Sequence, residues 1–321
     1  MKIIFFGLGS IGKRHARLIK DNFGYELYAF RSNHNSEKNQ LGIPEIYNLE
    51  EIDTIKPDIA FITNPTSEHI SYALYCAKKG IKLFIEKPLS NDQKNIQELM
   101  NEVKNKQLVA YTAYNLRFHP AIMWLKRYME KKNEEKKKDY FHVTVNTSSY
   151  LPSWRKNINH LNNYSAFRGL GGGAILDLSH EIDYLYYLFG NFKEIKVNSR
   201  KLSDVTVDSE DFADILLYFD CGMQGNVHIN FFSRLLRREM IIDFSDETII
   251  IDLINHNITI LKDKEKKVIN FDLEIDDIYT AQLKYFFDNI DNKQIMNNLE
   301  ESVKIFDVIL KIRDKVEWRG N

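Results

Sequence analysis

The 321-residue sequence is poor in cysteine and proline, with only two and six residues respectively. Cys76 and Cys221 are far apart and match no metal or redox spacing, which argues against a disulfide framework and predicts two buried apolar thiols in a reducing compartment. No segment approaches the ~18 apolar residues that a membrane span requires. Gly7, Gly9 and Lys13 break the apolar N-terminal run before it could serve as a signal peptide. We therefore expect a cytoplasmic protein without a membrane partner.

An excess of one charge is also missing. The 44 Lys+Arg and 45 Asp+Glu residues leave a formal net charge of −1. Because a basic surface is the electrostatic mark of nucleic-acid binding, we expect no nucleic-acid partner. The 44% apolar, 28% charged and 12% aromatic composition is typical of globular proteins. The length exceeds one ordinary domain of roughly 100–200 residues, which predicts two domains.

Residues 1–119 alternate short apolar runs with helical patterns, as in a doubly wound parallel sheet. The expected strands are Lys2–Phe6, Glu26–Phe30, a weak one near Ile46, Asp58–Thr63, Lys82–Ile85 and Leu108–Tyr114, and the expected helices are Ile11–Phe23, Thr66–Lys79 and Asp92–Asn105. This order predicts an α/β nucleotide-binding domain over 1–119.

The pattern changes after Pro120. A helix with a mixed-charge tail is followed by period-two or apolar runs at Phe141–Ser149, Phe212–Phe219, Gly225–Phe232, Glu239–Phe244, Thr248–Leu253 and Ile258–Leu261, with helices at Ala174–Phe189, Ile278–Ile290 and Leu299–Lys315. These runs predict an α+β domain over 120–321 with a mostly antiparallel open sheet, which would bind substrate and form oligomers. Phe212–Phe219 is apolar on both faces, so the second face needs a cover, and we expect a homodimer or homotetramer joined through it.

A glycine-rich turn follows the first expected strand. Gly7, Gly9 and Gly12 form G-x-G-x-x-G with Ser10 and Ile11 between them, and such glycines permit a tight turn, close approach of a pyrophosphate and close helix packing. A plain tight turn is the alternative. In this β/α context the five residues predict a Rossmann dinucleotide site.

The end of the second expected strand bears on cofactor choice. An NAD-selective turn carries Asp or Glu about 20 residues beyond the glycines, but here Arg31 and Ser32 follow Phe30. A guanidinium and a hydroxyl suit a 2′-phosphate. We therefore expect NADP to be preferred and NAD to be possible; the alternative is that Arg31 points to solvent and both cofactors are accepted.

Further motifs occur in order along the chain: Asn64-Pro65-Thr66-Ser67-Glu68-His69, Glu86-Lys87-Pro88, Tyr114-Asn115-Leu116-Arg117-Phe118-His119-Pro120, and Gly171-Gly172-Gly173 followed by Asp177, His180 and Asp183. Together with the glycine turn they resemble the Gfo/Idh/MocA oxidoreductase family over the whole chain. Tyr150–Arg155 and the stretch around the glycine triplet look like a subgroup associated with sugar and nonulosonic-acid (sialic-acid-like) biosynthesis.

The resemblance implies an NAD(P)-dependent oxidoreductase that interconverts a hydroxyl and a ketone on a sugar, nucleotide sugar or cyclitol. It implies a cis Lys87–Pro88 bond that aims Lys87 at substrate; the alternative is a solvent lysine. A histidine can titrate near neutrality, so His180 suits a general acid/base; the alternative is a histidine satisfied in the core. Asp177 lies three residues earlier on the same expected helix, one residue out of the family's commonest register, and could orient the imidazole or contact a substrate hydroxyl. Asp183 is then a polar helix residue.

Other site residues follow from the same resemblance. Asn64, Pro65, His69, Glu86, Lys87 and Arg117 are expected near the cofactor. For His69 a capping or packing role is the alternative. Arg117 could also lie in the substrate pocket, and its alternative is a domain-bridging salt bridge. The long irregular stretch before the glycine triplet carries Trp154, Arg155, Tyr164 and Arg168, which we expect at the sugar or anionic end of the substrate. The other histidines show no ligand spacing, and no metal is expected.

Two rival functions stay open at this point. The same fold could hydrolyse glycosides by transient oxidation of the substrate with bound NAD. It could also be a catalytically inactive sensor that binds dinucleotide, because a fold does not establish chemistry.

Overall fold

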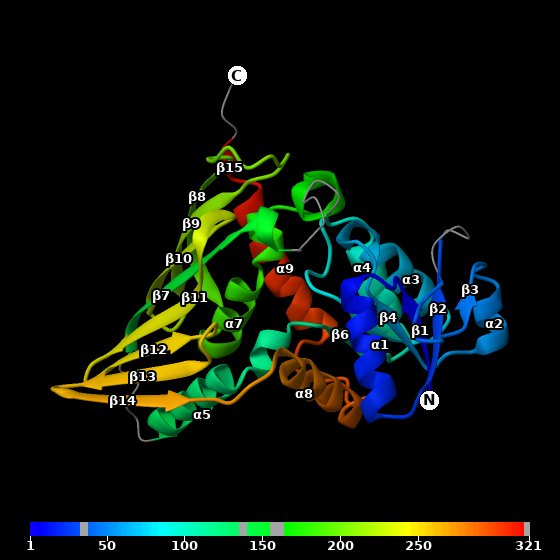
Figure 1. Cartoon of the computed structure of the whole chain (residues 1–321), viewed down its shortest axis with the longest axis horizontal. Helices are drawn as coiled ribbons and strands as arrows, with labels where there is room; N and C mark the ends of the chain where they lie inside the picture. The colour runs from blue at the N-terminus through cyan, green and yellow to red at the C-terminus, as the bar shows by residue number, and fades with distance from the viewer. Residues whose placement is uncertain (33–37, 135–139, 155–163, 318–321) are drawn as a thin grey trace. The chain divides into compact units, whose positions relative to one another are not determined.

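The computed structural model describes residues 1–32, 38–134, 140–154 and 164–317. The chain divides into two compact units (Figure 1). The first comprises Met1–Tyr114 and Ile275–Phe306, and the second Asn115–Glu274 and Asp307–Asn321. The sequence predicted one boundary at 119–120, whereas the chain returns to the first unit late. An amphipathic helix pattern shows that a helix buries one face, but not which sheet it buries that face against.

The first unit contains a six-stranded parallel sheet in the order β3-β2-β1-β4-β5-β6. The strands are β1 (Lys2–Phe6), β2 (Glu26–Phe30), β3 (Glu45–Ile46), β4 (Ile59–Ile62), β5 (Lys82–Ile85) and β6 (Ala110–Thr112). The predicted doubly wound sheet is confirmed. Its central strands are buried on both faces, which is why they read as continuous apolar runs.

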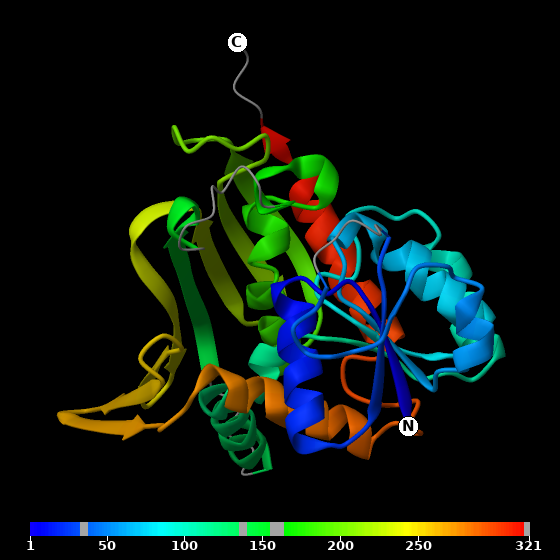
Figure 2. The ribbon, with the colours of Figure 1, turned by 45° about the vertical axis from the view of Figure 1, so that its right-hand side comes forward.

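Helices flank this sheet. They are α1 (Ser10–Asn22), α2 (Glu51–Ile55), η1 (Thr66–Glu68), α3 (His69–Lys78), α4 (Ile96–Asn105) and α8 (Ile275–Asp288). Figure 2 shows α8 in orange beside α1 in blue. The ring of Phe286 on α8 lies 5.1 Å from that of Phe84, which stacks on Phe61 at 4.3 Å. Full burial of such a side chain contributes about 1.5–3 kcal/mol, which accounts for the return of α8 to this unit.

The second unit is built on a nine-stranded sheet in the order β14-β13-β12-β11-β7-β10-β9-β8-β15. The strands are β7 (Tyr140–Tyr150), β8 (Phe192–Arg200), β9 (Phe212–Phe219), β10 (Gln224–Asn230), β11 (Phe232–Phe244), β12 (Thr248–Asp252), β13 (Asn257–Lys262), β14 (Glu265–Asn270) and β15 (Val316–Glu317). The pairs β7–β10 and β8–β15 are parallel and the others antiparallel. The predicted mostly antiparallel sheet is confirmed, while β8 and β14, which are rich in polar residues, and the two-residue β15 were missed.

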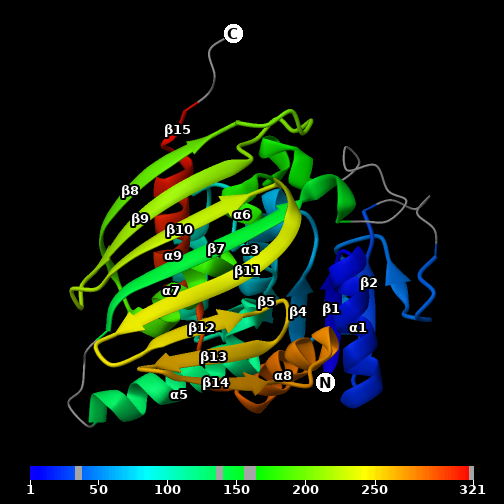
Figure 3. The ribbon, with the colours of Figure 1, turned by 60° about the vertical axis from the view of Figure 1, so that its left-hand side comes forward.

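Helix α7 (His180–Phe189) lies behind this sheet in Figure 3, and the opposite face is turned toward the viewer. On β9, Ile215, Leu217 and Phe219 are buried, whereas Leu216 on the other face is 48% exposed. The strand therefore alternates in burial although its sequence is apolar on both faces. The remaining helical elements of this unit are η2 (Asn115–Phe118), α5 (Pro120–Glu134), η3 (Leu151–Ser153), η5 (Tyr164–Ala166), η6 (Arg168–Leu170), α6 (Ala174–Asp177) and the end of α9 (Leu299–Arg313).

Two predictions are wrong in detail. The single helix expected over Ala174–Phe189 is split into α6 and α7, because the chain leaves helical geometry at Leu178. Of the two cysteines expected to be buried, Cys76 is buried but Cys221 is exposed, since it lies in the turn between β9 and β10 next to Gly222 (φ +89°). Among the helices in the described part of the chain, none has the length and apolar composition that crossing a bilayer requires.

Candidate active site

The glycine turn joins β1 to α1, and its glycines serve different purposes. A Cβ on Gly7 (φ +99°) would lie 2.8 Å from the Asn64 backbone, and one on Gly12 would overlap the carbonyl oxygen of Gly7. A Cβ on Gly9 would meet no atom within 4 Å. Packing therefore requires Gly7 and Gly12, whereas Gly9 leaves open space where a ligand could approach.

The adjoining helix end suits an anion. Helix α1 begins at Ser10, with no side-chain cap on its N-terminus and no acidic residue in its first turn. Backbone N–H groups at such an end, with Ile11 among the first, bind phosphate. The open space at Gly9 and this helix end fit the pyrophosphate of a dinucleotide.

His69 lies between two loops at the carboxyl edge of the parallel sheet. Its Nδ1 is 2.9 Å from the carbonyl oxygen of Pro88, and its Nε2 is 3.0 Å from that of Asn64. The ring is 1% exposed, and burial lowers the pKa of His69. A neutral imidazole donates to one of these oxygens at a time. This geometry favours the packing alternative for His69: it connects the Asn64-Pro65 turn to the loop of Lys87.

Lys87 lies just after β5, and the preceding residue, Glu86, holds its backbone. The Oε2 atom of Glu86 accepts a hydrogen bond from the Lys87 backbone N–H (3.1 Å), and Oε1 lies 2.7 Å from Nε2 of His15 on α1. His15 is fully buried and Glu86 is buried, whereas Lys87 is partly exposed. The Lys87–Pro88 bond is cis. Sequence reasoning missed His15, because nothing in a helical pattern identifies a partner that lies just after a strand 71 residues further along the chain.

Arg31 directly follows β2 and forms an ion pair with Glu45 on β3, with 2.8 Å between Nη1 and Oε1. Glu45 also accepts hydrogen bonds from the backbone and side chain of Asn39 (3.0 and 2.7 Å) and from the Tyr47 hydroxyl (2.8 Å). Burial opposes ionisation of Glu45, but these bonds and the charge of Arg31 outweigh it and lower its pKa. A carboxylate therefore lies beside Arg31. It comes from the neighbouring strand β3, whereas the rule for NAD selectivity considers only the residues about 20 positions after the glycine turn.

Asp177 and His180 lie on either side of the break between α6 and α7. Asp177 is the last residue of α6, His180 is the first of α7, and both are buried. The predicted common face of one helix is therefore absent. The next residue, Glu181, is fully buried and accepts hydrogen bonds from Thr147 Oγ1 (2.8 Å) and Arg238 Nε (2.9 Å), which fasten α7 to β7 and β11.

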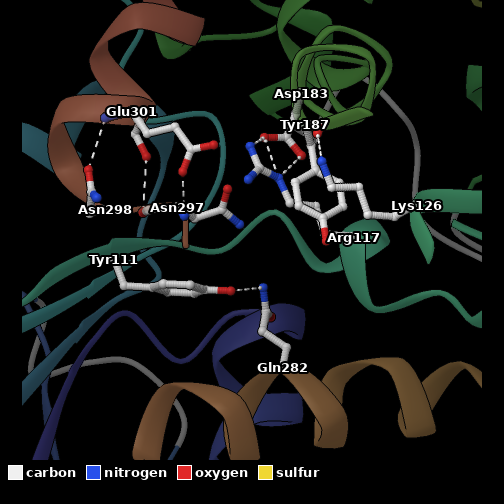
Figure 4. Close-up of polar contacts among 10 residues, drawn as sticks. Tyr111, Arg117, Lys126, Asp183, Tyr187, Gln282, Asn297, Asn298 and Glu301 are labelled. Atoms are coloured by element: carbon white, nitrogen blue, oxygen red, sulfur yellow. Dashed lines mark hydrogen bonds and ion pairs between the residues drawn. The ribbon is translucent and has the colours of Figure 1, made fainter. Parts of the chain in front are cut away.

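Arg117, predicted near the cofactor, forms a buried ion pair with Asp183. Its guanidinium contacts Asp183 through Nε (3.0 Å) and Nη2 (2.7 Å), and neither side chain is exposed. Figure 4 shows this pair beside Tyr187, whose ring lies 4.7 Å from the guanidinium. The ammonium group of Lys126 also lies over the Tyr187 ring. Both partners belong to the second unit. Arg117 is thus buried in an ion pair within one unit, and Asp183 is its partner rather than an unassigned polar helix residue.

The residues predicted to bind substrate are spread over the second unit. Trp154 is 39% exposed and donates from Nε1 to Ser149 Oγ (3.0 Å). Tyr164 begins η5, and Arg168 lies 3.4 Å from Glu210 through Nη1. Arg155 lies outside the described residues. A shared substrate role for these residues stays a prediction.

The comparisons with known proteins agree with this geometry. Residues 1–114 match the oxidoreductase family with an NAD-binding Rossmann fold, and residues 139–250 match the GFO/IDH/MocA C-terminal domain. The chain belongs to the Gfo/Idh/MocA family, whose dehydrogenases act on CH–OH groups with NAD(P).

Individual relatives are distant. The myo-inositol 2-dehydrogenase of Thermotoga maritima is 26% identical over 236 residues, 70% of this chain and 67% of that one. The structure of UDP-N-acetylglucosamine 3-dehydrogenase from Acidithiobacillus ferrooxidans has a TM-score of 0.79 at 18% identity, covering 98% of this chain and 97% of that one. The WlbA dehydrogenase from Bordetella pertussis, solved with NADH and UDP-GlcNAcA, has a TM-score of 0.77 at 16% identity, covering 97% and 94%.

Proposed function

We propose that this protein interconverts a hydroxyl and a ketone on a nucleotide-linked sugar, a sugar or a cyclitol in surface-glycan or sialic-acid-like sugar biosynthesis. The observation that carries the proposal is a dinucleotide-compatible turn with open space at Gly9, together with a partly exposed Lys87 at the same sheet's carboxyl edge. Ligands of open α/β sheets bind at that edge. The names of relatives that act on inositol and on UDP-N-acetylglucosamine support this range of substrates.

Each proposed catalytic residue has a chemical task. The glycine turn around Gly9 and the N-terminus of α1 would hold NAD(P)⁺, which would supply an acceptor for the hydride of the carbinol carbon. His180 accepts the hydroxyl proton as the C–O bond gains double-bond character, and the ammonium of Lys87 stabilises the negative charge developing on that oxygen. Asp177 orients His180 or accepts a hydrogen bond from a neighbouring substrate hydroxyl. In the reductive direction His180 returns the proton.

The test is a panel of nucleotide sugars, free sugars and cyclitols, followed by the nicotinamide absorbance with each cofactor. We expect net reduction of the cofactor with at least one member. Product formation from a glycoside without net accumulation of reduced cofactor would instead indicate hydrolysis by transient oxidation. Dinucleotide binding with no turnover of any member would favour a sensor. Both Lys87 and His180 are retained, although a sensor would need neither.

We also propose that the open face of the second unit's sheet joins copies of the chain into a homodimer or homotetramer. The exposed Leu216 lies on that face, which no described helix of this unit covers in Figure 3. A monomeric mass by light scattering at micromolar concentration would overturn this.

For the cofactor we keep NADP(H) as the proposed preference, on the strength of Arg31 and Ser32. The ion pair between Arg31 and Glu45 reduces the positive potential available to a 2′-phosphate, so we expect the preference to be modest.

A further inference from the structure

Glu210 is a buried acid that no motif contains. It lies in the loop between β8 and β9, two residues before Phe212, and its side chain is fully shielded from solvent. An acid in such a place needs partners. Two of its hydrogen-bond partners lie at the start of α6, in the segment that carries Asp177 and His180.

Glu210 accepts hydrogen bonds from the first backbone N–H groups of α6, although it lies 35 residues after Ile175 in the sequence. Its backbone carbonyl accepts a hydrogen bond from the Ala174 N–H (3.0 Å), and its Oε1 accepts one from the Ile175 N–H (3.3 Å). The N-cap residue, Gly173, provides no side-chain cap. One residue therefore supplies acceptors to the first two N–H groups of α6, which otherwise lack partners within the helix.

The carboxylate also occupies the space that a side chain at position 173 would need. A Cβ on Gly173 would overlap Oε1 and lie 2.7 Å from Cδ and 2.9 Å from Oε2 of Glu210. Gly173 has φ +120°, a conformation that favours glycine. The third glycine of the triplet is thus matched to Glu210.

Charged groups approach the carboxylate from two other elements. Nη1 of Arg168 on η6 is 3.4 Å from Oε2, and Arg313 on α9 acts on it electrostatically while donating from Nη2 to the Arg168 carbonyl (2.9 Å). On its own loop, Asp208 accepts a hydrogen bond from the Arg168 N–H, and Asp211 is engaged by Lys201. Burial outweighs the two guanidinium groups and raises the pKa of Glu210 to about 7.

We propose that Glu210 is a positioning residue for the catalytic segment: its ionised carboxylate anchors the N-terminus of α6 and thereby sets the placement of Asp177 and His180. The inference rests on the proposed function of those two residues. Protonation weakens the anchor, because a neutral acid still accepts from the Ile175 N–H but lacks the charge that strengthens this bond and the contact with Arg168. Activity therefore falls with decreasing pH through protonation of Glu210 as well as of His180, the proposed base.

The experiment compares Glu210→Gln, which keeps the shape but cannot ionise, with Glu210→Ala, which also empties the space. The control is Asp204→Asn, an exposed acid on the same loop. In wild type we expect log kcat to fall on the acid side with a slope of about one from the proposed base, His180, and with an additional step of roughly tenfold as Glu210 is protonated. In Glu210→Gln only the slope of about one remains, without the additional step, and kcat at high pH is roughly tenfold lower. Glu210→Ala lowers kcat by roughly 10- to 100-fold, while the cofactor Kd is unchanged in both.

Thermal unfolding gives an independent readout. Because the folded pKa of Glu210 is raised above the ordinary 4.5, its contribution to stability is present at low pH and is lost as pH rises through about 7. The Tm of wild type relative to Glu210→Gln therefore falls from pH 5 to pH 8, opposite to activity. If Glu210→Gln keeps the wild-type pH profile and kcat, the inference is overturned, even where His180→Ala is inactive. If His180→Ala is active, the proposed function itself fails.

Discussion

The carboxyl edge of the parallel sheet and the α6–α7 segment both carry predicted catalytic residues, but they are held in different ways. At the sheet edge, Lys87 directly follows β5 and the glycine turn directly follows β1, so the strand ends set their location. In the second unit, the places of Asp177 and His180 depend on contacts with residues outside their own motif, namely Glu210 and the Glu181 partners Thr147 and Arg238. Glu210 holds α6 and Glu181 holds α7.

The difference shows when a spacing rule works. A strand followed by a turn and a helix fixes its own residues, because the pattern itself is the structure. A spacing of three residues puts Asp177 and His180 on one face only if the helix continues between them, and here it stops at Leu178. No glycine or proline marks this break, and the bonds that place α6 come from position 210.

The largest expected effect concerns Arg117. It tests whether this residue acts within the second unit, where contacts between residues far apart in the sequence hold the elements in place. Arg117→Met leaves Asp183 buried without its ion partner, which should lower the free energy of unfolding by about 3–5 kcal/mol. Urea unfolding measures it. The double variant Arg117→Met/Asp183→Leu should recover most of the loss. Lys126→Met, on the same Tyr187 but partly exposed, should cost less than about 1 kcal/mol. A raised cofactor Kd without loss of stability would return Arg117 to the cofactor site.

The second prediction compares the two regions directly. Lys87→Ala and His180→Ala should each lower kcat by at least ~10²-fold, since acid–base catalysis typically contributes 10²–10⁴-fold. Cofactor binding, measured by nicotinamide fluorescence, should persist in both. Lys104→Ala and His228→Ala, at positions outside both predicted sites, are the matched controls. Near-normal turnover in His180→Ala would remove it as the base.

The same comparison explains which features of the fold and of the candidate site could be predicted from the sequence. The six parallel strands, the glycine turn and the site of Lys87 could be predicted, because each depends on a few neighbouring residues. The membership of α8 in the first unit could not, since its apolar face fits any sheet until Phe286 is seen against Phe84. His15 and Glu45 were missed for a related reason. Their partners, Glu86 and Arg31, are adjacent only after the strands align.

The third prediction concerns the contact between His15 and Glu86, which supports Lys87 at the carboxyl edge of the sheet. His15→Phe keeps a ring among Phe84 and Tyr279, which lie 5.1 and 5.5 Å from it, but leaves Glu86 Oε1 without its 2.7 Å contact. Loss of one partner of a buried polar group costs about 1–3 kcal/mol. We expect kcat to fall with little change in KM, because Glu86 also holds the Lys87 backbone. Unchanged kcat together with reduced stability would make His15 purely structural.

The smallest expected effect is on cofactor choice, where a local rule and a distant residue oppose each other. The sequence window predicts NADP(H) because Arg31 and Ser32 occupy the place of an acid, whereas Glu45 pairs with Arg31 at 2.8 Å. A carboxylate repels a 2′-phosphate and a guanidinium attracts it. We expect wild type to favour NADP(H) by about tenfold or less, a difference near 1.4 kcal/mol. Arg31→Ala should lose NADP(H) use selectively, and Glu45→Gln should gain it, with kcat/KM for both cofactors as the measure. Exposed Glu26 at the start of β2 supplies the control, Glu26→Gln, which should change neither ratio. Equal or better use of NAD(H) by wild type, with no shift in Glu45→Gln, would show that neither residue governs the choice.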